Sequence, residues 1–172
     1  MMGKFVSTKV FDGFSCVFRQ WKAETTHCRF LHGYGISFKV WFEGELDDRN
    51  WVWDFGGMKR AKGQIDGMSP KEWMDYMFDH TFLVAEDDPF RESFLAMNEA
   101  GAAQVRVIPA TGAERFAQFI FEKLNPFIKE ETEGRVKVIR VEFREHGKNS
   151  AMYEESSSNE KLETVLKTLS SL

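Results

Sequence analysis

Alternating apolar and polar positions predict two strands early in the chain. Residues 4–10 and 35–42 are rich in β-branched and aromatic residues, and in the second range Ser37 and Lys39 separate the apolar even-numbered positions. A period of two is typical of strands with one buried face, so we expect an antiparallel pair. Residues 50–55 are expected to form a third extended piece.

Capping signals predict the first helices. Asp54, followed by a Phe-Gly-Gly turn, suits the cap of a short helix. Ser69 is followed by a proline and, three residues after the cap, by Glu72. This is a capping box, and it predicts a helix over 73–77. Another helix is expected within 89–100.

The strongest helical pattern follows a predicted strand at 104–109. Thr111 and Glu114 repeat the capping-box spacing. Apolar residues then recur at helical spacing, namely Phe116, Phe119, Ile120, Phe121 and Leu124. The polar residues 129–133 are expected to form a linker after this helix.

Residues 136–145 alternate as a strand does. Strict alternation places Glu145 on the same face as Val141 and Phe143. The opposite face would carry Val136, Val138, Arg140, Glu142 and Arg144. A carboxylate at the end of an apolar face needs a partner, because desolvating a lone charge costs several kcal/mol. Glu145 is therefore either a binding group or half of a structural ion pair, for example with Arg144.

The order of these elements predicts an α+β domain over residues 1–153, with a mainly antiparallel sheet and helices on one face. Residues 154–172 are rich in Ser and Glu, and helical spacing returns at Leu162, Val165 and Leu169. We expect a C-terminal tail or short helix there.

Composition narrows the class of protein. A chain of 172 residues with 42% apolar residues is long enough for one domain with a sizeable core. A net charge of −4 gives no support to a nucleic-acid partner. The chain has neither an apolar run of membrane-spanning length nor a signal peptide, so we expect a cytoplasmic protein. Cys16 and Cys28 are then expected to be thiols, a disulfide being the minor alternative.

The stretch 27–35, HCRFLHGYG, concentrates the candidate chemistry, because it holds two of the four histidines and one of the two cysteines. By chemical type, Cys16, His27 and His32 could form a metal site. An extended segment would point His27 away from Cys28, which counts against this set. His27 could instead lower the pKa of the Cys28 thiol or lie exposed in a loop, and Cys28 could be a small buried hydrophobe.

Five ordered motifs resemble the family of 6-pyruvoyltetrahydropterin synthase and 6-carboxytetrahydropterin synthase. They are Cys28 followed by His32-Gly33, Trp53-Asp54-Phe55 before a helix, Phe78-Asp79-His80 followed by Phe82-Leu83, Thr111 with Glu114 at a helix start, and Glu145 eight residues before Tyr153. The resemblance implies the tunnelling fold, in which four-stranded antiparallel sheets with helices on one face join into a barrel. It also implies a homo-oligomer, a trimer or hexamer, with active sites between protomers.

The resemblance further implies a lyase that acts on dihydroneopterin triphosphate in queuosine or tetrahydrobiopterin biosynthesis. Cys28 falls at the position of the catalytic base, Asp79 and His80 at the proton-transfer pair, and Glu145 at the pterin anchor. Thr111 and Glu114 fall in the substrate-binding region, although their spacing equally predicts a helix cap. Asp79 and His80 could also be a capping pair in a turn.

Zinc is implied by the resemblance, but the positions of its usual ligands are altered here. His32 occupies one of them, while Phe18 and Tyr34 occupy the other two. Phenylalanine has no donor atom, and a catalytic zinc usually has three protein ligands. Any zinc site would need substitutes such as His27 or Cys16.

Three functions are therefore open: a pterin synthase of this family, an aldolase-type lyase that cleaves the side chain of a pterin, and a pterin-binding homologue without activity. Basic residues near Cys28, namely Arg19, Lys22 and Arg29, could meet a triphosphate or be solvated.

Overall fold

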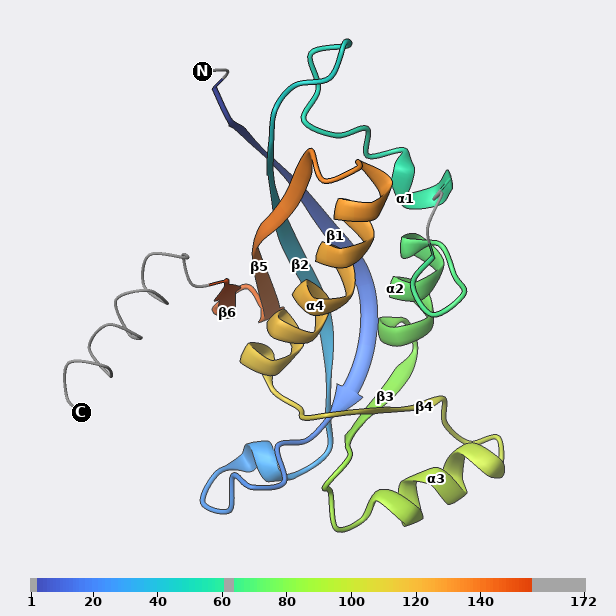
Figure 1. The fold of residues 1–172 in the computed structure, drawn as a ribbon. Coiled ribbons are helices and arrows are strands. Elements are labelled where there is room, and N and C mark those ends of the chain that lie inside the picture. Colours follow the sequence, from blue (N-terminus) through green and yellow to red (C-terminus); the bar gives the residue numbers. More distant parts are fainter. Residues whose placement is uncertain (1–2, 61–63, 156–172) are drawn as a thin grey trace, which may run out of the picture.

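A computed structural model describes residues 3–60 and 64–155 (Figure 1). The elements in chain order are β1 (Phe5–Phe18), the 3-10 turn η1 (His27–Arg29), β2 (His32–Gly44), α1 (Gly57–Arg60), α2 (Pro70–Phe78), β3 (Thr81–Ala85), α3 (Arg91–Glu99), β4 (Val105–Ile108), α4 (Ala113–Glu131), β5 (Val136–His146) and β6 (Asn149–Glu154). Within these residues, no helix has the length and apolar character needed to cross a bilayer.

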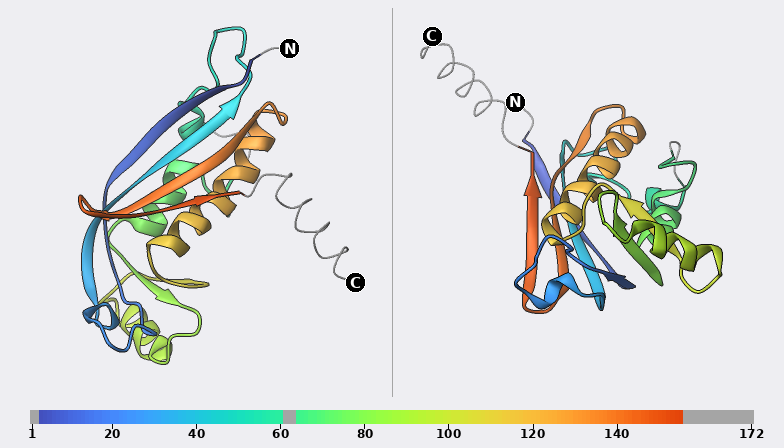
Figure 2. Two further views of the ribbon diagram at one scale, coloured as in Figure 1. Left: turned by 90° about the vertical axis from the view of Figure 1, so that its left-hand side faces the viewer. Right: turned by 90° about the horizontal axis from the view of Figure 1, so that it is seen from below.

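One curved sheet organises the molecule, with α4 lying across one of its faces (Figure 2). The strand order is β4-β3-β1-β2-β5-β6. The pairs β1–β2, β2–β5 and β5–β6 are antiparallel, which confirms the predicted α+β class with a mainly antiparallel sheet. The sheet has six strands rather than the expected four, because the short strands β3 and β4 extend it by parallel pairing to β1 and to each other. Strand β4 confirms the strand predicted at 104–109, whereas β3 was not predicted.

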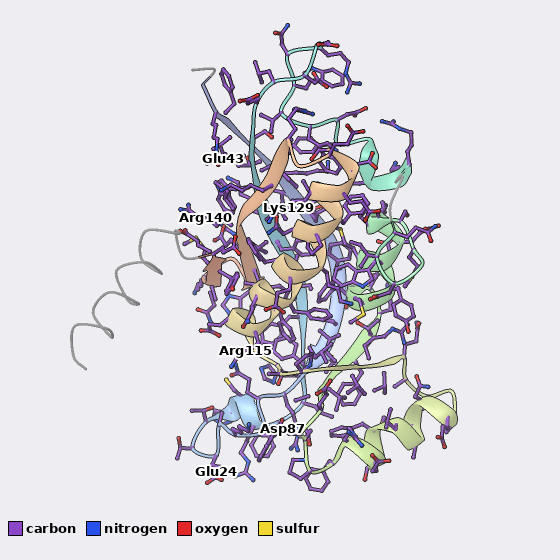
Figure 3. All side chains as sticks on the ribbon, viewed as in Figure 1. Glu24, Glu43, Asp87, Arg115, Lys129 and Arg140 are labelled. Carbon is purple, nitrogen blue, oxygen red and sulfur yellow. The ribbon has the colours of Figure 1, made fainter. Side chains whose placement is uncertain are left out.

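The main core lies between the sheet, α4 and α2. The predicted apolar face of α4 is confirmed, since Phe116, Ile120 and Leu124 are fully buried. Against expectation, α3 covers the other face of the sheet at the β3–β4 edge. Phe82 packs there against Phe94 of α3, with ring centroids 4.7 Å apart. The exposed charged side chains labelled in Figure 3 include those of Arg115 and Lys129 on α4.

Two predicted boundaries are wrong. Residues 50–55 form a loop rather than a strand, and Arg135 fixes this loop by donating to the carbonyls of Glu45 and Val52. Residues 129–131 belong to α4 rather than to a linker. Their polarity is that of the solvent-facing side of an amphipathic helix.

The capping box at Ser69 is confirmed, with Glu72 and Ser69 bonded reciprocally. The prediction of a second capping box, at Thr111 and Glu114, is wrong. The N-cap of α4 is Gly112, which makes no side-chain cap, and the Thr111 hydroxyl instead donates to the Arg19 carbonyl at 2.6 Å. Gly112 has a φ of 119°, and a Cβ there would collide with the Gln20 side chain.

Strand β5 does not alternate strictly, because its register against β2 shifts between Val138 and Arg140. The resulting bulge turns Val138 to the same core as Val141 and Phe143, all of them buried. The predicted separation of these residues onto two faces is therefore wrong. Strand β6 was not predicted, and residues 156–172, the site of the predicted tail or helix, lie outside the described residues.

Candidate functional site

Cys28 lies in η1, within the connection between β1 and β2. Its backbone is held on both sides, since its N–H donates to Thr26 Oγ1 at 3.3 Å and its carbonyl accepts from the N–H of Gln20 at 2.8 Å. The side chain is half-buried, and the neighbouring His27 is exposed. Cys28 is therefore neither a core residue nor freely exposed.

Cys16 behaves differently, because its side chain is buried in the main core. Burial, together with the nearby charge of Glu145, raises the pKa of its thiol to about 12. Cys16 stays protonated at neutral pH and cannot act as a thiolate nucleophile or base.

We expect iodoacetamide to label Cys28 alone in the native protein at pH 8. The thiolate is the reactive form, and the half-buried Cys28 is accessible to the reagent whereas Cys16 is buried. Mass spectrometry of peptides should find label on Cys16 only after unfolding in guanidinium. Equal labelling of both cysteines in the native protein would contradict this arrangement.

A cluster of rings lies next to Cys28 at the paired ends of β1 and β2. Phe18 is directly opposite His32, and Cys16 is opposite Tyr34, so all four side chains share one face. Phe18 stacks on Tyr34 with ring centroids 5.0 Å apart and meets Phe116 of α4 edge-on at 4.8 Å. The position where the resemblance implies a first zinc ligand is thus part of the aromatic core.

His32 has a partner on each ring nitrogen. Nδ1 lies 2.6 Å from the carbonyl oxygen of Phe30, and Nε2 is hydrogen-bonded to the Tyr34 hydroxyl. Burial, with the charges of Glu145 and Cys28, raises the pKa of Tyr34, so its hydroxyl stays protonated at neutral pH.

These residues do not fit a zinc ion. Phe18 has no donor atom, and His32 is already bonded through both nitrogens. Among residues 3–60 and 64–155, no three His, Cys, Asp or Glu side chains lie close enough together to hold a metal. The alternative set of Cys16, His27 and His32 is therefore not assembled within one chain.

Glu145 lies near the end of β5, at a second irregularity in the strand. The pairing with β6 shifts between Arg144 and His146, and Glu145 has no partner in this register. Such a bulge redirects side chains, and here the His146 ring stacks on Tyr34 with centroids 6.3 Å apart. His146 was not predicted as a site residue; its position directly after Glu145 was the available signal.

The Glu145 carboxylate is half-buried. Burial and the charge of Glu114 raise its pKa, while His146, His32 and a hydrogen bond from Asn149 act in the opposite direction. The ion pair considered for it is absent: Arg144 pairs with Glu142 at 3.0 Å instead. The ring of the next residue, His146, stacks on Tyr34, which places Glu145 beside the ring cluster.

Asp79 and His80 lie at the end of α2, where His80 adopts a φ of 55°. The His80 Nδ1 is 2.9 Å from the Asp79 carboxylate, and its side chain is 77% exposed. His80 lines a cavity of about 310 Å³ with Ser15 and Val17, on the α3 side of the sheet. No described contact within the chain joins this pair to Cys28.

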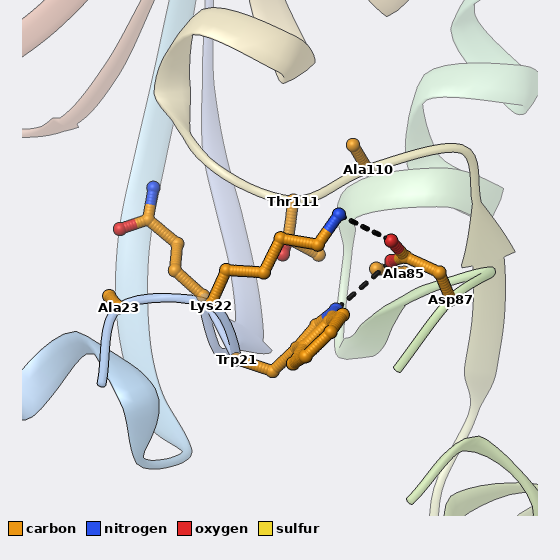
Figure 4. A pocket seen from close by; sticks show the side chains of 8 residues that line it. Trp21, Lys22, Ala23, Ala85, Asp87, Ala110 and Thr111 are labelled. Carbon is orange, nitrogen blue, oxygen red and sulfur yellow. Dashed lines mark hydrogen bonds and ion pairs between the residues drawn. The ribbon is translucent and has the colours of Figure 1, made fainter. Parts of the chain in front are cut away.

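A cavity of about 340 Å³ adjoins the Cys28 connection, between residues 20–23, Asp87 and Thr111 (Figure 4). The nearby cations are already paired: Lys22 with Asp87 at 2.5 Å, and Arg19 with the buried Asp88 at 2.6 Å. Arg19 is therefore structural, which disfavours the triphosphate contact considered for it. Glu114 is exposed in the first turn of α4.

Comparisons with known proteins place this architecture. The family model described as 6-pyruvoyl tetrahydropterin synthase matches residues 7–156. An uncharacterized protein from Wolinella succinogenes has a similar structure, with a TM-score of 0.74 and 22% identity over 89% of this chain and 99% of its own. The 6-pyruvoyl tetrahydropterin synthase of Caenorhabditis elegans gives a TM-score of 0.60 and 19% identity over 90% and 98%.

The corresponding synthase of Plasmodium falciparum gives a TM-score of 0.54 and 16% identity over 88% of this chain and 99% of its own. No curated protein matches the sequence at a significant level. At these identities the solved structures establish the fold, and the family model covers most of the sequence. The chain belongs to the 6-pyruvoyl tetrahydropterin synthase family.

Proposed function

We propose that this protein binds a reduced pterin and acts on its side chain as a lyase, with Glu145 as the anchor of the ring and Cys28 as the base. One observation carries the proposal: the ring of His146, the residue directly after Glu145, stacks on Tyr34 near the start of β2, and Cys28 lies in the connection that leads into this strand. The carboxylate proposed to bind the ring and the thiol proposed as the base would thus lie at the same end of the sheet.

The chemistry of the two groups suits a pterin. The edge of a pterin ring offers adjacent N–H donors, and one carboxylate can accept two of them. Burial makes the Glu145 carboxylate less well solvated, so such donors would be favoured partners. A Cys28 thiolate could then remove a proton from a side-chain carbon beside the ring.

We further propose that Asp79 and His80 complete the site across a subunit boundary. They contact one another but not Cys28 within one chain, as the exposed position of His80 indicates. In a homo-oligomer, a trimer or hexamer, the pair of one copy would assist Cys28 of another. An isolated monomer would then be inactive.

A second candidate reaction, aldolase-type cleavage of the side chain, is favoured by the misfit of Phe18 and Tyr34 to zinc. In this reaction a side-chain hydroxyl loses its proton, and the carbon that carries it becomes the carbonyl carbon of an aldehyde. The bond between this carbon and the side-chain carbon attached to the ring breaks. The electron pair of that bond passes into the pterin ring. The carbon that remains on the ring takes a proton, for which the Cys28 thiol is the candidate donor.

The test incubates the protein with 7,8-dihydroneopterin triphosphate and, separately, with 7,8-dihydroneopterin. Mass spectrometry would identify the products and a phosphate assay the released triphosphate. Release of triphosphate supports the synthase reaction. Formation of two products, a pterin with a shortened side chain and a free aldehyde, supports the cleavage reaction. Tight pterin binding without product would contradict both and leave a binding protein.

Glu145→Gln should raise the Kd for the pterin by about 10- to 100-fold, because hydrogen bonds to a charged group contribute about 1.5–3 kcal/mol. Glu99→Gln, at the exposed end of α3, is the matched control and should leave the Kd unchanged. Equal affinities of the two variants would contradict the role of Glu145.

A further inference from the structure

The hydrogen bonds of His32 and Tyr34 have a fixed direction. The Phe30 carbonyl, 2.6 Å from His32 Nδ1, can only accept, so Nδ1 carries a proton. In the neutral ring Nε2 then accepts, and the Tyr34 hydroxyl is its donor. The Tyr34 proton is therefore committed to His32, which leaves the lone pairs of its oxygen as acceptors.

Packing fixes the place of this oxygen. The Tyr34 ring lies against Phe18 on one side, with centroids 5.0 Å apart, and is stacked on His146 at 6.3 Å. His146 directly follows Glu145, and Cys28 lies in the connection that leads into β2, which carries Tyr34 near its start. A pterin anchored by Glu145 and extending its side chain toward Cys28 would thus pass beside Tyr34.

We infer that the Tyr34 oxygen accepts a hydrogen bond from a side-chain hydroxyl of the pterin, with His32 as its positioning residue. This role rests on the proposed function. It takes the place of a metal, because Phe18 and Tyr34 stand where the resemblance implies two zinc-binding imidazoles. The ligand class is a reduced pterin whose side chain carries at least one hydroxyl.

The test compares the Kd of 7,8-dihydroneopterin with that of 6-methyl-7,8-dihydropterin, which lacks side-chain hydroxyls. The wild-type protein, dialysed against chelator, should bind the hydroxylated pterin about 5- to 10-fold more tightly, the effect of one net hydrogen bond. Tyr34→Phe keeps the ring stack and should abolish this preference while leaving the affinity for the methyl compound unchanged. Tyr76→Phe, an exposed tyrosine of α2, is the matched control and should keep the preference.

Several outcomes would overturn the inference. An unchanged preference in Tyr34→Phe would remove the role of the hydroxyl. If the preference for the hydroxylated pterin disappears on chelation and returns with zinc, a bound metal rather than Tyr34 would recognise the side-chain hydroxyl. If the wild-type protein binds neither pterin, the proposed function fails and the role of Tyr34 fails with it; if it binds both equally, only the role of Tyr34 fails.

A gain-of-metal variant tests the position independently of any pterin. The double substitution Phe18→His and Tyr34→His restores imidazoles beside His32, and elemental analysis after exposure to zinc should find about one zinc per chain, against none in the wild-type protein. A wild-type protein that retains one zinc per chain would contradict the inference, as would a folded double variant that binds none. If the double variant does not fold, the pterin preference of Tyr34→Phe remains the test of the inference.

Discussion

Cys28→Ala is expected to reduce pterin turnover about a thousand-fold, because a positioned acid or base contributes roughly 10²- to 10⁴-fold to a rate. The loop should survive the substitution, since the backbone of Cys28 rather than its side chain makes the described hydrogen bonds to Thr26 and Gln20. The measurement is kcat under saturating substrate, beside the Kd for the pterin. We expect kcat to fall while the Kd and the melting temperature change little.

Cys16→Ala supplies the matched comparison, because it removes the other thiol of the chain, which is buried in the main core. Loss of a small buried side chain should lower the melting temperature by a few degrees and leave kcat close to the wild-type value. Unchanged turnover in Cys28→Ala would contradict the assignment of the base. A large loss in Cys16→Ala at a temperature where it is folded would point to the wrong cysteine.

Elements with a local cause could be predicted from the sequence. The capping box at Ser69 needs only neighbouring residues, and it forms as expected. The apolar face of α4 is set by helical periodicity, and Phe116 and Ile120 are buried accordingly. Local rules of this kind succeed where no distant contact competes with them.

Distant contacts explain the misses. Thr111 resembles a helix cap by spacing, but its hydroxyl bonds to Arg19, 92 residues away in the sequence. Two bulges in β5 change which face its residues occupy, and a bulge depends on the neighbouring strand. Strand β3 is buried along its whole length, so it lacks the alternation of polar and apolar residues by which the other strands were predicted.

In the candidate site, too, the sequence indicated the features with local causes and missed those that depend on distant contacts. Its residue types were visible in the sequence, and the resemblance proposed roles for Cys28 and Glu145. The hydrogen bond between His32 and Tyr34 depends on side-chain direction within β2, and the stack of His146 on Tyr34 depends on the end of β5. In the sequence, Tyr34 indicated only that a zinc ligand is replaced. In the structure, its hydroxyl is held by a hydrogen bond to His32.

The ion pair of Arg19 and Asp88 joins the end of β1 to the segment between β3 and α3. It is bidentate, with distances of 2.6 and 2.8 Å, and the Asp88 side chain is 2% exposed. Asp88 also accepts from the N–H of Phe90 at 2.8 Å, and the guanidinium lies over the Phe90 ring. The Arg19 carbonyl accepts from Thr111, so the pair also steadies the residues beside the Cys28 connection.

Asp88→Ala is therefore expected to lower the free energy of unfolding by about 3–5 kcal/mol, because it leaves the Arg19 charge largely buried and unpaired. Asp87→Ala, which removes an exposed partner of Lys22, is the adjacent control and should change stability little.

Burial opposes ionisation of Asp88, but the hydrogen bonds from Arg19 and Phe90 prevail and lower its pKa below 3.8. The contribution of this ionised carboxylate is then fully present above about pH 4 and is lost as the pH falls through the lowered pKa. Urea unfolding at pH 7 and pH 3 measures both effects: the deficit of Asp88→Ala should be large at pH 7 and smaller at pH 3, and equal stabilities of the two variants at pH 7 would refute the structural role of the pair.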